Sequence, residues 1–137
     1  MKLDSSAFVA DKPLIEALER RSSPIVCEED RILFKQGDEA TGLYILRGGA
    51  GRVSMISSTG DQVMSVPVSS GSLLGLPAVL GNQPYSLTAM VYKGAELRHV
   101  SREDFTKLML NEPSLSLSVL RILAAEVRTA RIAISAY

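Results

Sequence analysis

Few residues of this chain have the type and spacing that catalysis or metal binding requires. His99 is the single histidine, and no cysteine or pair of carboxylates stands near it at a metal-ligand spacing. Cys27 is the single cysteine, and it precedes Glu28, Glu29 and Asp30, whose negative charges disfavour the thiolate that a nucleophilic cysteine needs. No Gly-x-Ser-x-Gly motif is present. We therefore expect no enzyme, no catalytic residue and no metal or haem site.

The stretch Gly71–Val91 has a different character. It reads GSLLGLPAVLGNQPYSLTAMV, with glycines spaced as in loops that bring backbone amides close to a phosphate, yet it contains no charged residue. The flanking sequence also contains no Arg or Lys between Arg52 and Lys93. Because a guanidinium fork is the usual partner of phosphate oxygens, the sequence leaves two alternatives: a pocket for an apolar ligand, or a segment filled by its own side chains.

Composition restricts the class of protein. A chain of 137 residues with 46% apolar residues suits one compact domain. Fifteen basic residues balance fifteen acidic ones, so the chain lacks the positive charge that drives direct binding of nucleic acid. One cysteine excludes an intrachain disulfide, and no signal peptide or run of eighteen apolar residues is found. We expect a cytoplasmic protein that neither spans nor binds a membrane.

The pattern of breaks predicts a helix, then many short strands, then helices. Asp11 and Pro13 are typical of the start of a short amphipathic helix. From Arg31 on, short apolar runs alternate with glycines, and SSTGDQ predicts a hairpin turn between strands at 53–56 and 63–68. Further strands are expected at 87–92 and 97–100. This spacing favours an all-β sandwich or barrel.

The C-terminal part is predicted to be helical. Ser101 stands three residues before Asp104, a variant of the capping box, and Pro113 ends that helix and opens the next one. The last helix carries an apolar stripe with steps of three and four residues, formed by Leu120, Leu123, Val127, Ala130 and Ile134. This stripe either packs on the protein's own barrel or pairs with a second copy, and we expect a homodimer.

These motifs together resemble a known family. The run ILFKQGDEATGLYILRGGAGRV is similar to the opening strands of the cyclic nucleotide-binding domains of the catabolite activator and FNR (Crp/Fnr) regulators, and Gly60, Gly71, Gly75 and the last helix continue the match. The resemblance implies a double-stranded β-helix (β-roll) with flanking helices and a long dimerisation helix. It divides the chain into an N-terminal tail at 1–12, a β-roll with its helices at 13–112, and the dimerisation helix at 113–137.

The resemblance also implies where a ligand would bind. In the family a Gly-Glu-Leu sequence and a later Arg-Ser/Thr-Ala sequence hold the cyclic phosphate and the ribose. The candidate pocket residues here are Gly75, Leu76, Pro77, Leu87, Thr88 and Ala89. Leu76 stands at the Glu position and Leu87 at the Arg position, and Pro77 lacks an amide proton. A hydroxyl that the family places on the last helix would correspond to Ala130 or Arg131, one residue after Thr129.

We therefore expect a homodimeric sensor-type regulatory domain whose binding of cyclic AMP or cyclic GMP is weak or lost, with no other cofactor. Loss of a bidentate, charge-assisted phosphate contact alone costs roughly 10-fold to 100-fold in affinity. Two alternatives stay open. The domain binds another small effector, or it is a ligand-free interaction module that dimerises or binds a protein partner, including the effector domain of a truncated transcription regulator.

Overall fold

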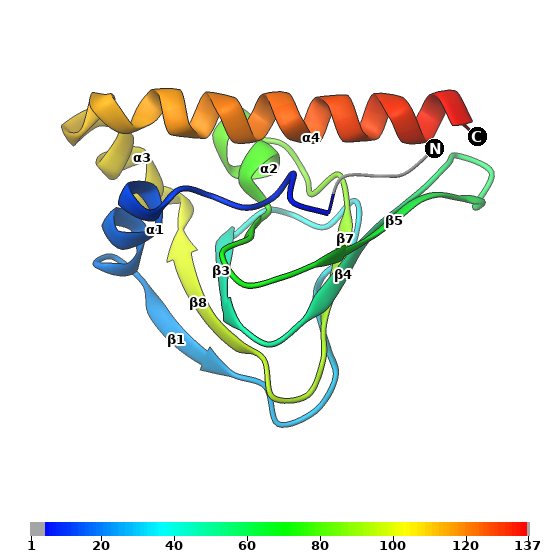
Figure 1. Cartoon of the computed structure of the whole chain (residues 1–137), viewed down its shortest axis with the longest axis horizontal. Helices are drawn as coiled ribbons and strands as arrows, with labels where there is room; N and C mark the ends of the chain where they lie inside the picture. Colours follow the sequence, from blue (N-terminus) through cyan, green and yellow to red (C-terminus); the bar gives the residue numbers. More distant parts are fainter. Residues whose placement is uncertain (1–4, 137) are drawn as a thin grey trace.

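Two antiparallel four-stranded sheets form the body of the protein. The computed structural model describes residues 5–136. One sheet has the order β1-β8-β3-β6 and the other β2-β7-β4-β5. The strands are β1 (Ser23–Val26), β2 (Arg31–Phe34), β3 (Gly42–Gly48), β4 (Gly51–Ile56), β5 (Gln62–Val68), β6 (Leu73–Leu74), β7 (Thr88–Val91) and β8 (Glu96–Ser101). Figure 1 shows the strands folding over to form a roll beneath one long helix. The predicted β-roll class is confirmed.

Alternation along β3 divides the apolar side chains between two cores. Leu46 belongs to a cluster between the two sheets, which we call the roll core, whereas Leu43 and Ile45 belong to a second cluster beneath the helices, the helical-layer core. Successive side chains of a strand point to opposite faces, so one strand contributes to both cores.

The helices begin where the sequence predicts. Helix α1 (Lys12–Glu19) is capped by Asp11, whose Oδ1 accepts a hydrogen bond from the Leu14 amide at 3.2 Å. Helix α3 (Arg102–Asn111) is capped by Ser101, whose hydroxyl accepts from the Asp104 amide at 3.1 Å. Such caps satisfy amides that would otherwise lack partners at the helix start. The capping motif read from the sequence is confirmed.

The N-terminal segment before α1 packs on the roll. Phe8 is 2% exposed, and its carbonyl oxygen accepts a hydrogen bond from the Leu73 amide at 2.7 Å. Val9 forms an isolated β-bridge with Ser72. Of the segment expected as a tail at 1–12, residues 1–4 lie outside the described part of the chain, and Phe8 is a core residue of the rest.

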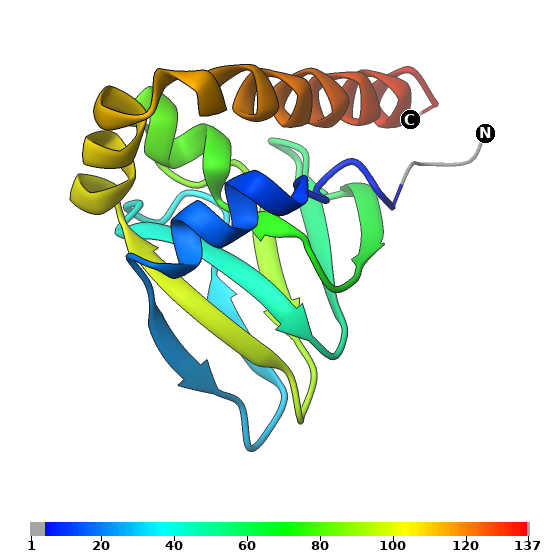
Figure 2. The ribbon, with the colours of Figure 1, turned by 60° about the vertical axis from the view of Figure 1, so that its left-hand side comes forward.

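One long helix crosses the roll and carries two different faces. A 3₁₀ turn (η1, Pro113–Leu115) leads into α4 (Ser116–Ala136), which runs along the top of the molecule in Figures 1 and 2. The buried side chains, which form its inner face, are Val119, Ile122, Glu126, Thr129 and Ala133. They recur in steps of three and four residues, as expected for one face of a helix. The predicted stripe, Leu120 to Ile134, follows the same steps one residue later and lies on another face.

Candidate functional site

The segment that corresponds to the family's phosphate-binding loop lies between the roll and α4. It runs from β6 through Gly75 and helix α2 (Leu76–Gly81) to β7. Gly75 has φ +95°, and a Cβ on it would stand 2.9 Å from Cε1 of Tyr85. Glycine is therefore required here both for the backbone conformation and for the close approach of Tyr85.

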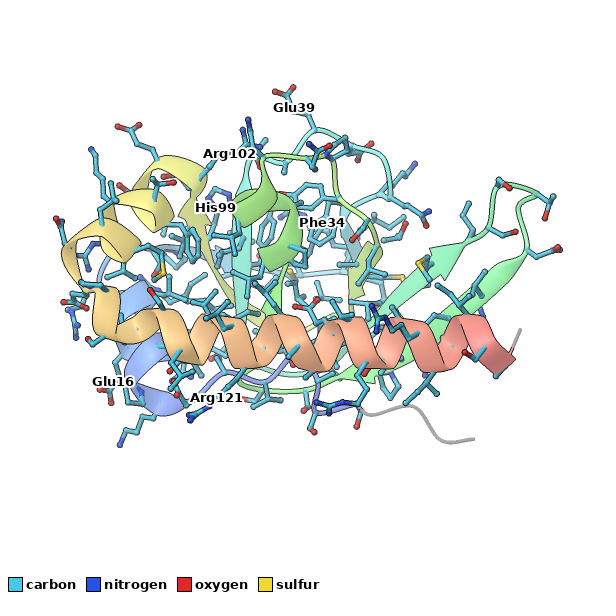
Figure 3. The ribbon with its side chains drawn as sticks, turned by 90° about the horizontal axis from the view of Figure 1, so that it is seen from above. Glu16, Phe34, Glu39, His99, Arg102 and Arg121 are labelled. Carbon is cyan, nitrogen blue, oxygen red and sulfur yellow. The ribbon has the colours of Figure 1, made fainter. Side chains whose placement is uncertain are left out.

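Tyr85 fills the space beside Gly75. Its ring stacks on Phe34 with the ring centroids 3.8 Å apart, and its hydroxyl donates to the Gly42 carbonyl oxygen at 2.5 Å. The same hydroxyl accepts from the Thr41 and Gly42 amides at 3.3 Å. Figure 3 shows Phe34 within the ring of strands, seen from the α4 side. Tyr85 thus fastens the loop after α2 to the roll.

Little space is left in this pocket. The cavity between the loop and α4 has a volume of about 10 Å³, which is about the minimum for one water molecule. Its lining is Phe8, Phe34, Val53, Leu74, Gly75, Pro77, Ala78, Tyr85, Ser86, Leu87 and Glu126. Pockets that bury small organic ligands are of the order of 300 Å³ or more. In this conformation a nucleotide does not fit.

The residues predicted for the pocket separate into two groups. Gly75, Pro77 and Leu87 line the cavity. Leu76 does not: it is fully buried in the helical-layer core with the residues of α1 and α3. The sequence placed Leu76 among the candidate pocket residues, whereas the large side chains that line the cavity include Tyr85 and Phe34.

Thr88 and Ala89 also lie away from the cavity. The Thr88 hydroxyl accepts a hydrogen bond from the Gln36 amide at 2.9 Å, so it holds the β2–β3 connection. Ala89 is fully buried in the roll core, opposite Val53 in the β4–β7 register. Neither residue is part of the cavity lining.

Sequence reasoning missed the one charged side chain in the lining, Glu126. The residue is 9% exposed, and its Oε2 atom is buried without a hydrogen-bond partner among the described residues. Burial raises the pKa of its carboxyl from 4.5 to about 8, because an apolar surrounding disfavours the charged form. The signal in the sequence that could have revealed Glu126 is a carboxyl in the middle of a helix face whose other members carry no charge.

The helical hydroxyl is corrected in position. Thr129 is 2% exposed on the inner face of α4, whereas Ala130 is half-buried and Arg131 is exposed. The hydroxyl that faces the roll therefore belongs to Thr129, one residue before the positions 130 and 131 that the resemblance implied. Its neighbour on the same face, one turn earlier, is Glu126.

The predicted dimer stripe lies on the outside of the molecule. Leu120 is 58% exposed, Val127 50% and Ile134 58%, while Leu123 and Ala130 are half-buried. A shallow groove runs along this face, lined in its middle by Leu123, Val127 and Arg131. Single exposed apolar residues are common, but a continuous stripe along one helix marks an interaction surface.

The other residues that were considered for chemistry, His99 and Cys27, are packed against the rest of the fold. The His99 ring lies beside the ring of Tyr44 in a tilted arrangement, with the centroids 5.0 Å apart and 60° between the ring planes, and burial lowers the pKa of His99 below 6.5. Burial is also the main reason that the pKa of Tyr44 is raised above 10. Cys27 is buried. Within residues 5–136 no cluster of three potential metal ligands occurs, and no helix there has the length and hydropathy of a membrane span.

A larger hollow lies elsewhere, between α1 and the β1–β8 edge, with a volume of about 870 Å³. It is an open groove whose lining carries both signs of charge, including the ion pair between Arg47 and Glu19. Exposed ion pairs contribute little energy and recognise no particular charge. The groove shares no residue with the phosphate-loop segment.

A roll of this topology with a loop between β6 and β7 and a long helix across it defines a class of small regulatory domains. Residues 24–112 match the family model of the cyclic nucleotide-binding domain, and the chain belongs to this family. It is related to the Crp/Fnr regulators: it is 28% identical over 109 residues to the anaerobic regulatory protein of Aggregatibacter actinomycetemcomitans, which covers 80% of this chain and 41% of that protein.

Solved structures agree on the fold. The catabolite activator protein of Thermus thermophilus superposes with a TM-score of 0.76 at 23% identity, covering 96% of this chain and 62% of that one. The sensor domain of the regulator DNR from Pseudomonas aeruginosa gives 0.66 at 18% identity, with 88% and 81% covered. The chain spans less than half the length of the regulator it matches in sequence and corresponds to the sensor part.

A different kind of protein contains a similar domain. Human patatin-like phospholipase domain-containing protein 6 is 28% identical over 134 residues, which cover 90% of this chain and 10% of that protein. The domain therefore occurs in at least two molecular contexts. Its presence defines a sensor-type module, not the output to which the module is connected.

Proposed function

We propose that this chain is a sensor-type domain that has lost cyclic nucleotide binding and acts as a homodimerising interaction module. The observation that carries this proposal is the pocket: about 10 Å³ remain where the family holds its ligand, and Tyr85 stacked on Phe34 occupies the rest. The alternative, an effector other than a nucleotide, would require the loop at 82–87 to leave this position.

Electrostatics favours the same conclusion. A cyclic phosphate in this cavity would find no Arg or Lys in the lining, and the carboxyl there, Glu126, is uncharged when protonated and repels an anion when ionised. Burying a phosphate without a cation or a set of donors costs several kcal/mol at least. Pro77 removes an amide at the start of α2 as well. Two independent terms, volume and charge, oppose nucleotide binding.

The outer face of α4 supports the dimerisation half of the proposal. Its stripe of leucine, valine and isoleucine lies along a helix of 21 residues, which is roughly 30 Å long. Steps of three and four residues allow two such helices to interlock along their length. Arg128 and Arg131 border the groove and remain exposed, as charged residues at the rim of a helix pair do.

The test is the molar mass of the purified chain in solution, measured by light scattering. We expect the mass of two chains, and the mass of one chain for Val127→Glu, which places a charge in the middle of the stripe. The matched control is Leu110→Glu, since Leu110 on α3 is 76% exposed and lies off the stripe. A monomeric wild type, or dimers in Val127→Glu, would overturn the proposal.

A further inference from the structure

Among residues 5–136, Glu126 is the one carboxyl with a buried oxygen atom that has no hydrogen-bond partner. Its position is central: it lies in the middle of α4 and faces the cavity beneath that helix. An ionised carboxylate at such a place must be paired or hydrated, because an isolated charge in an apolar surrounding is very costly. The neutral acid is much better tolerated there.

The neighbours of Glu126 offer it no counter-charge. Tyr85 is the single other titratable residue in the described lining, and its hydroxyl is committed to the Gly42 carbonyl oxygen. Arg52, on β4, donates to the Ser65 hydroxyl at 2.8 Å. On α4 itself, Arg121, Arg128 and Arg131 are exposed on other faces. Elements from the N-terminal segment to β7 therefore present an apolar wall to Glu126.

The residue that follows Glu126 on the same helix, Val127, is apolar. The inner face comprises residues 119, 122, 126, 129 and 133, and the outer stripe comprises 120, 123, 127, 130 and 134. The two faces have identical spacing and differ by one residue, or about 100° of rotation. A turn of α4 by one residue that brings Val127 over the cavity would move Glu126 to the half-buried position that Ala125 now holds, where an open hollow of about 230 Å³ leaves room for water.

We propose that Glu126 is the proton-binding site of a conformational switch, in which the neutral carboxyl lets α4 seat on the roll and loss of the proton makes α4 leave this seat. In the closed cavity the protonated acid fits beside Leu87 and Phe8 without a charge to hydrate. Once ionised, it requires water that a volume of about 10 Å³ does not supply. The cost is relieved when the middle of α4 turns or lifts.

A switch that works at physiological pH needs a group whose charge changes near neutrality. Burial raises the pKa of Glu126 to about 8, close enough to neutrality that modest changes of pH alter its charge. The proposed movement of α4 on the roll can occur in a single chain. Its consequence for the dimer rests on the proposed function, because the outer stripe would turn together with the inner face.

The experiment is a carbon-13 NMR titration of the Glu126 carboxyl from about pH 5 to about pH 9, assigned by its absence in Glu126→Gln. The methyl signals of Leu87 and Val127 are followed in the same samples. We expect the carboxyl and both methyl groups to change with one shared midpoint well above the ordinary value for a glutamate. In Glu126→Gln the methyl signals should stay constant, and in the matched exposed variant Glu39→Gln they should titrate as in wild type. Figure 3 shows Glu39 pointing away from the roll.

Two results would overturn the proposal. Titration of Glu126 in the ordinary acidic range would mean that the residue is not held in the apolar cavity. A raised midpoint with unmoved Leu87 and Val127 methyl groups would mean that the proton is bound without any movement of α4. Molar mass measured in parallel separates these outcomes from failure of the proposed dimer, because the carboxyl titration is independent of whether the chain pairs.

Discussion

Tyr85 lies flat against Phe34, with 3.8 Å between the ring centroids, and both residues line the small cavity beneath α4. The two residues come from elements that are far apart in the sequence. Phe34 ends β2, and Tyr85 belongs to the loop between α2 and β7. Their contact places the ring of Tyr85 in the roll core, although the residues around it at 80–84 are exposed.

Removal of the Tyr85 hydroxyl should destabilise the fold. In Tyr85→Phe the Gly42 carbonyl oxygen and the Thr41 and Gly42 amides lose their partner, and each buried polar group left unsatisfied costs roughly 1–3 kcal/mol. We expect the free energy of unfolding in urea to fall by about 2 kcal/mol or more. Tyr92→Phe, at a half-buried tyrosine outside the pocket, is the control and should change little. Equal stabilities for the two variants would contradict this role of Tyr85.

An arginine at position 87 should pair with Glu126 rather than create a nucleotide site. Leu87 and Glu126 both line the cavity, so the guanidinium of Leu87→Arg can reach the carboxylate. An adjacent positive charge favours the ionised acid, and the pKa of Glu126 should fall from about 8 toward the ordinary range. Carbon-13 NMR of the carboxyl measures the change.

The double variant Leu87→Arg/Glu126→Gln separates pairing from phosphate binding. Without the carboxylate, the arginine is free for an anion, and affinity for cyclic AMP should exceed that of Leu87→Arg by at least ~10-fold. Calorimetric titration of both variants is the measurement. Equal measurable affinities would show that the introduced arginine does not face the cavity, and no binding by either variant would show that the small volume of the cavity excludes the nucleotide whatever the charge.

Stability should decrease as pH rises because of Glu126. The folded state, with a pKa of about 8, keeps the proton that the unfolded chain loses near 4.5, so between these values the folded state binds more protons. The contribution of Glu126 is therefore fully present below about 4.5 and is lost as pH rises to about 8. Each pKa unit corresponds to about 1.4 kcal/mol, which gives several kcal/mol in all.

Thermal unfolding across this range tests the sign. Wild type should melt at progressively lower temperature as the pH rises, and Glu126→Gln should show a flatter profile. The control Glu39→Gln, at an exposed loop position, should follow wild type. A wild-type profile parallel to that of Glu126→Gln would contradict the buried, neutral carboxyl.

His99 should act in the opposite direction. Burial lowers its pKa below 6.5, so the unfolded chain takes up this proton first as pH falls, and the contribution of His99 is lost as pH falls below 6.5. Because the ring is partly exposed, the effect on stability should be small. NMR titration of the imidazole should give a midpoint below 6.5, and Tyr44→Ala, which removes the neighbouring ring and exposes the imidazole, should raise that midpoint. A midpoint at or above 6.5 would contradict the partial burial of His99.

The sequence was sufficient for the features that depend on local patterns. The caps Asp11 and Ser101, the hairpin between β4 and β5 and the long last helix all follow from short-range signals, and all are present. The apolar stripe of α4 was recognised as distinct from the rest of the helix, and its exposure agrees with that. Whether it pairs with a second copy stays a prediction.

Long-range packing was beyond sequence reasoning. Leu76 was placed in the pocket because its sequence position matches a binding residue, yet the first turn of α2 directs it toward α1 and α3. Tyr85 stacks on a residue about fifty positions earlier, a contact that no local pattern reveals. Glu126 falls on the inner face because of the rotation of α4, and a shift of one residue in that rotation would have placed it in solvent.

The central claim is that the pocket is closed to cyclic nucleotides while the domain still dimerises. It is tested most directly by calorimetric titration of the purified chain with cyclic AMP and cyclic GMP, with the molar mass followed by light scattering in the same samples. We predict no heat of binding at micromolar to millimolar nucleotide and the mass of two chains throughout. Saturable heat with a micromolar constant would contradict the account, because it would require Tyr85 to leave Phe34 and the loop at 82–87 to open.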